Sequence, residues 1–145
     1  MIRSVTLASC LAALAFAAPA LAGGAPERPG ETWGQIHDQL WPGRAIADGE
    51  GLIDLDAPVR AEDAAIVPVT VRIAPEAGRR VEAMTIIVEE NPAPVAAEFE
   101  FGQAIGPDIE LSTRLRVDSY SNVRVVARLD DGSLHETARF VKASG

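Results

Sequence analysis

Short segments in which hydrophobic and polar residues alternate constrain the fold of this chain more than any other feature of its sequence. In residues 66–73, valine or isoleucine stands at every odd position from 67 onward, whereas Thr70 and Arg72 lie between them. A period of two places these two sets on opposite faces of an extended strand, one face buried and the other in water. On this basis we predict strands at residues 51–55, 66–73, 81–90, 95–101, 109–117, 123–129 and 134–141.

Turn residues separate these segments. The pair Asp131-Gly132 is the strongest hairpin signal in the chain, since aspartate and glycine suit the backbone angles of a tight turn. Residues 91–94, Asn-Pro-Ala-Pro, predict a stiff turn, and Pro68 predicts an edge position or an early place in its strand because it lacks an N–H. Strands of this length and spacing predict an all-β fold, an immunoglobulin-like antiparallel β-sandwich, and a small β-barrel stays open as the alternative.

One segment near the N-terminus has a helical period instead. Trp33, Ile36 and Leu40 recur at spacings of three and four residues, and Trp41 follows them on the same side. A Pro-Gly pair then ends the pattern. We predict one short amphipathic helix over residues 31–40, with its apolar face packed on the β-domain or on a partner.

The N-terminal residues 1–22 have the three parts of a secretory signal peptide. Arg3 supplies the positive charge, residues 5–16 form an apolar run too short for a transmembrane helix, and residues 20–22 (Ala-Leu-Ala) form the cleavage site. A lipoprotein site at Cys10 is the competing interpretation, and it fits less well because most of the apolar run follows that residue. We therefore predict export to the periplasm, a flexible leader at residues 23–30 and one domain at residues 31–145.

The acidic balance of the chain limits its partners. The sequence holds 13 basic and 21 acidic residues and has a formal net charge of −8. Without Arg3 the balance becomes 12 against 21, which is −9. An acidic surface repels nucleic acid and anionic membrane, so we expect neither as a partner once the signal peptide is cleaved. It suits a basic protein partner, and simple solubility is the alternative explanation.

The residues after the signal peptide lack the patterns of a metal or thiol site. His37 and His135 have no neighbour at the spacing of a metal ligand and are expected to face solvent. The only cysteine is Cys10, which leaves with the signal peptide. We therefore predict no metal, no cofactor and no thiol nucleophile.

Two pairs of adjacent carboxylates are the remaining candidates for chemistry. Glu89-Glu90 and Asp130-Asp131 both lie beside predicted turns. Solvated turn charges are far commoner than acid–base pairs in this position, so we expect solvated charges. The sequence therefore predicts no catalytic residue, and the protein is not expected to be an enzyme.

Two arginines stand on the polar side of one predicted strand. Arg114 and Arg116 are two residues apart, opposite the apolar set. We expect these arginines to pair across strands with Glu98 and Glu100, which is a structural role. The functional alternative is that they contact a partner protein. The candidate partner-binding residues are Arg114, Arg116, Phe99 and Phe101.

Several segments, in this order, resemble the SoxY sulfur-carrier family. The similarity extends over most of the chain after residue 33. In sequence these segments are most similar to the SoxYZ-like carriers associated with quinoprotein dehydrogenases. The segments that carry it are residues 60–69, 90–94, 99–102, 112–117, 131–133 and 140–145.

The resemblance implies a periplasmic immunoglobulin-like domain that pairs with a SoxZ-like domain, either separate or fused. It also implies a flexible Gly-Gly-Cys-Gly-Gly arm whose cysteine holds sulfur intermediates during thiosulfate oxidation. Ser144 and Gly145 would then be the attachment point of this arm. The printed sequence departs from the family here, because no cysteine follows them. Two hypotheses stay open: a carrier domain that lacks its cysteine in this chain, or a cysteine-less module that docks on a SoxZ-like domain or on a quinoprotein dehydrogenase.

The signal peptide generates a direct prediction. Protein recovered from the periplasm should begin at Gly23, because signal peptidase cuts after the small residue at position 22. N-terminal sequencing checks this. A cytoplasmic protein that retains Met1 would contradict it.

Overall fold

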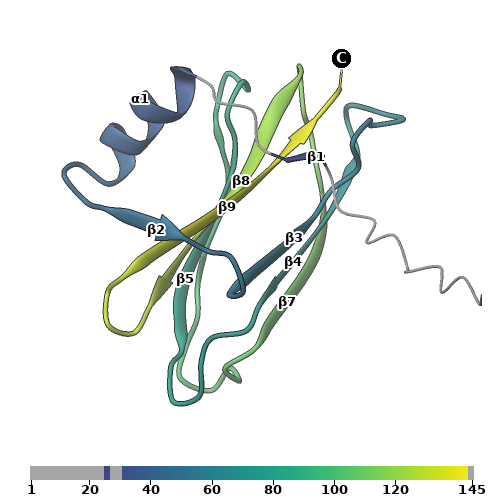
Figure 1. Cartoon of the computed structure of the whole chain (residues 1–145). Helices are drawn as coiled ribbons and strands as arrows, with labels where there is room; N and C mark the ends of the chain where they lie inside the picture. Colours follow the sequence, from purple (N-terminus) through teal and green to yellow (C-terminus); the bar gives the residue numbers. More distant parts are fainter. Residues whose placement is uncertain (1–24, 27–30, 144–145) are drawn as a thin grey trace, which may run out of the picture.

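The computed structural model describes residues 25–26 and 31–143, which form one helix and nine strands (Figure 1). No helix among these residues is long and apolar enough to cross a membrane. The elements are β1 (Ala25–Pro26), α1 (Glu31–Leu40), β2 (Ile46–Asp48), β3 (Ile53–Asp56), β4 (Val67–Ile73), β5 (Val81–Val88), β6 (Val95–Glu100), β7 (Ile109–Leu115), β8 (Ser121–Leu129) and β9 (Leu134–Val141).

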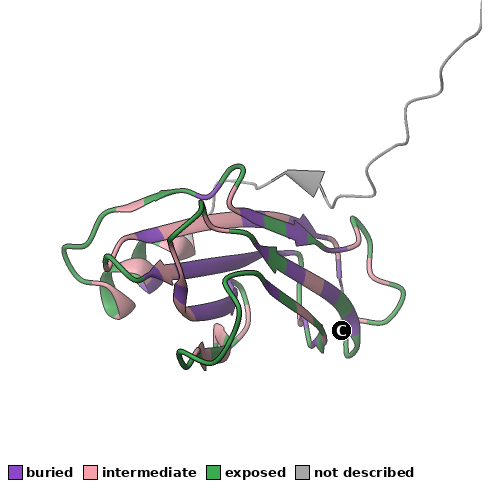
Figure 2. Ribbon diagram, turned by 90° about the horizontal axis from the view of Figure 1, so that it is seen from below, coloured by how far each residue is buried: buried purple, intermediate pink, exposed green. Residues whose placement is uncertain are grey.

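The strands form two sheets around one core. The larger sheet has the order β1-β9-β8-β5-β6, with β2 also paired to β9, and the smaller sheet has the order β3-β4-β7. The pairing of β2 with β9 is parallel, and the other strand pairings are antiparallel. Buried and exposed residues alternate along several strands (Figure 2), and the buried set, such as Val69, Ile86 and Val125, fills the space between the sheets. The predicted all-β, immunoglobulin-like sandwich is confirmed.

Most predicted elements are present, with small shifts at their ends. The helix spans residues 31–40 as predicted, and Pro68 is the second residue of β4. β1 and β2 were not predicted, because strands of two and three residues are too short to show a period. Both strands form because their backbones pair with β9. β1 falls within the predicted leader, whereas the signal peptide and the other leader residues lie outside the described part of the chain.

The chain crosses from the larger sheet to the smaller one at Gly49, between β2 and β3. The amide of Gly49 donates a hydrogen bond to the carbonyl oxygen of Glu136 at 2.7 Å. A Cβ atom at this position would lie 2.8 Å from that oxygen and 2.9 Å from Cδ1 of Ile53. The close approach therefore requires glycine at the crossing.

The predicted hairpin at Asp131-Gly132 joins β8 to β9, and Gly132 has a positive φ of 80°. The two aspartates are exposed, as expected of turn charges, and Arg79 bridges them. Its Nε lies 2.9 Å from Asp130 Oδ1, and its Nη2 lies 2.6 Å from Asp131 Oδ2. Hydrogen bonds from Ser133, together with the Arg79 guanidinium, hold the pKa of the Asp131 carboxyl well below its usual range.

α1 packs on the outer face of the larger sheet. Ile36 contacts a second apolar cluster that contains Ile87, Val126 and Leu134. Val126 alternates along β8 with residues of the main core, so it points to the opposite face of the sheet. The predicted apolar face of the helix is therefore covered by this domain itself.

A buried ion cluster lies beside this helix. Arg124 and Glu89 are each 1% exposed, and Arg124 Nη2 lies 2.7 Å from Glu89 Oε1. Arg124 Nη1 lies 3.1 Å from Glu136 Oε1, and Asn122 donates to the second oxygen of Glu89 at 2.9 Å. The Trp33 ring covers the guanidinium, with its centroid 4.1 Å from Cζ. The expectation that Glu89 is a solvated turn charge is wrong, because folding brings Arg124 and Asn122 to it.

Replacing Arg124 with leucine should destabilise the domain strongly, because Glu89 would stay buried without its charge partner. We expect a loss of about 3–5 kcal/mol in the free energy of unfolding, measured by urea denaturation. The matched control is Arg72→Leu, which removes exposed pairs with Asp54 and Glu110. That change should cost about 1 kcal/mol or less. Equal losses in the two variants would contradict this role for Arg124.

Candidate functional site

The end of β9 is held by backbone hydrogen bonds beyond the last strand residue. The amide of Lys142 donates to the carbonyl of Val59 at 2.9 Å, and the amide of Ala61 donates to the carbonyl of Lys142 at 3.0 Å. Ala143 is 2% exposed and belongs to the main core. The chain is therefore fixed up to Ala143. The predicted attachment point of the arm, Ser144 and Gly145, lies outside the described residues.

Both edges of β9 are paired along most of its length. β8 covers one edge over the whole strand. On the other edge, β2 pairs with residues 134–136 and β1 pairs with residues 139–140. Arg60 bridges to Lys142 just beyond them. β9 is thus a rigid support for whatever follows it in the chain.

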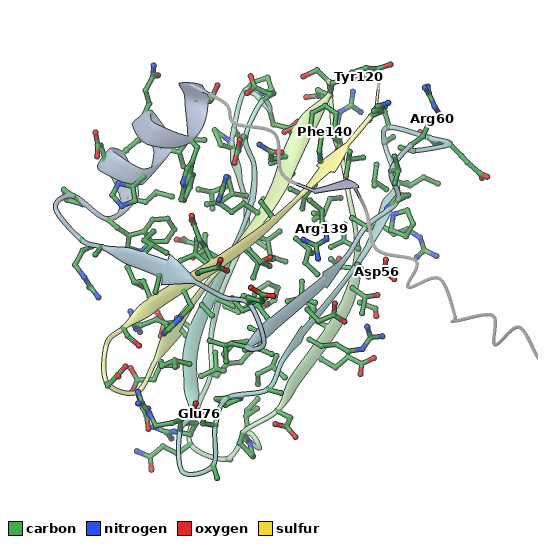
Figure 3. All side chains as sticks on the ribbon, in the orientation of Figure 1. Asp56, Arg60, Glu76, Tyr120, Arg139 and Phe140 are labelled. Carbon is green, nitrogen blue, oxygen red and sulfur yellow. The ribbon has the colours of Figure 1, made fainter. Side chains whose placement is uncertain are left out.

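Exposed apolar side chains surround this end of β9. Tyr120 is 50% exposed and makes an edge-on contact with Phe140, with ring centroids 6.4 Å apart at 87°. Val59, which bonds to Lys142 through its backbone, is 45% exposed. Figure 3 places Tyr120, Phe140 and Arg60 at the same end of the molecule, with Glu76 at the opposite end.

Asn91 positions the loop that leads to Tyr120. Its Nδ2 donates to the carbonyl of Arg116 at 2.8 Å, and its Oδ1 accepts from the amide of Asp118 at 2.9 Å. The sequence predicts only a stiff turn at Asn91. An asparagine before a proline signals only local side chain–backbone bonding, so bonds to residues 25 and 27 positions away could not be predicted from it.

A second feature is the open side of the sandwich formed by β6 and β7. Each is the last strand of its sheet, so each has one unpaired edge among the described residues. Phe99 and Phe101 stack with ring centroids 6.3 Å apart and an interplanar angle of 4°. Both are half-buried and pack against the main core together with Leu111. We call β6, β7 and these three side chains the open edge.

Arg114 of β7 and Arg116, just after this strand, do not pair as expected. Glu98 and Glu100 belong to the larger sheet, whereas β7 belongs to the smaller one, so the predicted cross-strand pairs are wrong. Arg116 Nε instead lies 2.5 Å from Asp118 Oδ1. Arg114 is exposed and makes no ion pair with any residue that the structure describes.

The histidines are half-buried rather than fully solvent-facing. His37 Nε2 lies 2.9 Å from the carbonyl oxygen of Arg44, and His135 Nε2 lies 3.1 Å from Ser133 Oγ. Within residues 25–26 and 31–143, no group of three His, Cys, Asp or Glu side chains could hold a metal ion.

Comparison with known proteins agrees with this architecture. A family model described as "Sulfur oxidation protein SoxY" matches residues 37–145. The chain belongs to the SoxY family. The sulfur carrier protein SoxY from Chlorobium limicola f thiosulfatophilum is similar to this SoxY-family domain, with a TM-score of 0.60 and 25% identity. The similarity covers 77% of this chain and 91% of that one.

A more distant likeness concerns the fold alone. A putative superoxide reductase from Thermotoga maritima has a TM-score of 0.52 and 11% identity to this SoxY-family domain, over 70% of this chain and 95% of that one. No curated protein matches the chain.

Proposed function

We propose that this SoxY-family domain is a non-catalytic, periplasmic carrier domain of thiosulfate oxidation that lacks the carrier cysteine in this chain, and that the end of β9 is where a carrier thiol would be attached. The observation that carries the proposal is the support of β9 up to Ala143 by Val59, Ala61 and the main core. The similar SoxY from Chlorobium limicola f thiosulfatophilum is a sulfur carrier protein. The periplasmic part of the proposal rests on residues 1–22.

A thiolate is the group that this chemistry needs. When a cysteine thiolate joins the outer sulfur of thiosulfate, one sulfur–sulfur bond forms and two electrons leave to an acceptor on a partner enzyme. Residues 23–145 contain no cysteine. The folded domain would therefore supply a fixed attachment point for a thiol placed after β9. Partner enzymes would carry out the oxidation.

Adding Gly-Cys-Gly-Gly after Gly145 should create a site that can be modified, because the new thiol would follow the supported end of β9. After incubation with thiosulfate and the thiosulfate-oxidising enzymes of the same organism, intact-mass measurement should show one sulfur adduct per chain. A Gly-Ser-Gly-Gly extension is the matched control and should show none. The unextended chain should also stay unmodified.

Failure of the Gly-Cys-Gly-Gly chain to acquire an adduct would contradict the carrier proposal. If that chain still formed a complex with a SoxZ-like domain or a quinoprotein dehydrogenase, the second candidate function would hold. In that case the domain is a binding module that needs no thiol of its own.

We also propose that a SoxZ-like domain docks on the open edge. Phe99 and Phe101 supply apolar surface there, and the unpaired edges of β6 and β7 supply backbone donors and acceptors. Arg114 is free to contact an acidic group at the rim. An interface of standard size would bury about 1,600 Å² in total.

Reversing the charge of Arg114 should weaken this complex. We expect Arg114→Glu to lower the affinity for the SoxZ-like domain about three- to tenfold, since it replaces one rim attraction with a repulsion. The control is Arg60→Glu, which makes the same change of charge on an exposed residue near the end of β9. Size-exclusion chromatography and titration calorimetry give the stoichiometry and the affinity. A complex weakened only by Arg60→Glu would place the interface at the end of β9 instead.

A further inference from the structure

A cavity of about 240 Å³ lies between the end of α1 and strands β5 and β6. Leu40 and Trp41, at the end of the helix, line one side of it. Ala83 of β5 and Val126 of β8 line it from the sheet. The part of the larger sheet beside α1 is therefore hollowed, and its lining combines apolar side chains and the Trp41 ring with the polar side chains of Thr85, Glu98, Glu100 and Arg128.

The carboxylates on the β6 side of the cavity are not equivalent. Arg128 Nη2 lies 3.2 Å from Glu100 Oε2, and Arg128 Nε lies 3.7 Å from Glu82 Oε2, so Arg128 balances these two charges. Glu98 also lines the cavity, is exposed, and has no ion pair with any residue that the structure describes. Arg128 and Glu100 thus line the cavity as an ion pair, and the Glu98 carboxylate is the charge of the lining that has no partner cation among the described residues.

The position of Glu98 connects the cavity to the open edge. Glu98 is paired in register with Thr85, and Thr85 also lines the cavity. β6 has β5 on one side and no described strand on the other. A strand added along β6 would place side chains beside Glu98, within reach of the cavity.

We infer that this cavity is a subsite for a basic side chain, arginine or lysine, carried by a partner strand that adds to β6. The inference rests on the proposed docking of a partner at the open edge and adds the chemistry by which that partner is recognised. The methylene stem of the basic side chain packs on Leu40 and Val126. Its charged head lies on the Trp41 ring and pairs with Glu98.

Charge favours a cation, because the lining holds two carboxylates, Glu98 and Glu100, against one guanidinium, Arg128, which is already paired with Glu100. An anion at this position would face Glu98 directly, and a purely apolar side chain would leave that carboxylate partly desolvated without a partner. The net charge of −8 also favours the approach of a basic surface over the acidic domain.

The subsite can be tested without the partner. Titrating the ¹⁵N-labelled exported chain with Nα-acetyl-arginine amide should shift the indole N–H signal of Trp41 and the amides of Ala83 and Thr85 in a saturable way. The amide of Val59, which lies near the end of β9 and outside the cavity lining, is the internal control and should not move. The uncharged citrulline amide, at matched ionic strength, should produce much smaller shifts.

Two variants separate the contributions of Glu98 and Trp41 to binding of the arginine probe. Glu98→Gln, on an exposed residue that the fold does not need, and Trp41→Leu should each weaken binding of the arginine probe about two- to fivefold. Glu62→Gln, which removes an exposed carboxylate elsewhere, should leave it unchanged. Equal shifts with arginine and citrulline amides, or no saturable shift at Trp41, would overturn the inference.

Binding measurements with the SoxZ-like domain distinguish a failure of the subsite from a failure of the proposed docking. If that domain does not bind but the arginine probe still saturates Trp41, the docking proposal fails and the cationic subsite stands. If the domain binds and Glu98→Gln has no effect on its affinity, the subsite is overturned and the docking proposal stands.

Discussion

The buried guanidinium of Arg124 is the interaction on which the larger sheet and its helix depend. It lies on β8 and contacts a carboxylate on either side, Glu89 just beyond β5 and Glu136 on β9, while Trp33 of α1 covers it. A buried charge that loses its partner is costly, so these four elements keep one arrangement. The position of α1 in turn places Trp41 beside β5 and β6, where the cavity forms.

The surfaces that remain for partners are those whose side chains and backbone groups are not already covered or paired within the domain. α1 covers the part of the outer face of the larger sheet around Ile87, Val126 and Leu134. On the smaller sheet, outward polar residues pair with one another, as Thr70 does with Ser112 at 3.0 Å. Among the described residues, the open edge and the end of β9 are two places that remain for partners. Because these lie apart, a partner at the edge leaves the end of β9 free, as a carrier domain requires.

The candidate site was only partly predictable from the sequence. Phe99 of β6 and Phe101, just after this strand, face the same way because residues two apart in an extended chain do so, and they stack as that spacing allows. The partners expected for Arg114 were wrong, since Glu98 and Glu100 belong to the other sheet. Alternation identifies the two faces of a strand, but it carries no information about which strand lies next to it.

The sequence by itself determined the local features: the period of the strands, the helix over residues 31–40 and the hairpin at Asp131-Gly132. Each of these depends on residues only a few positions apart. The tertiary structure alone decided which sheet each strand joins, the crossing at Gly49, and the burial of Glu89, whose partner Arg124 is 35 positions away. The physical reason is that burial and strand pairing depend on distant segments that only folding brings into contact.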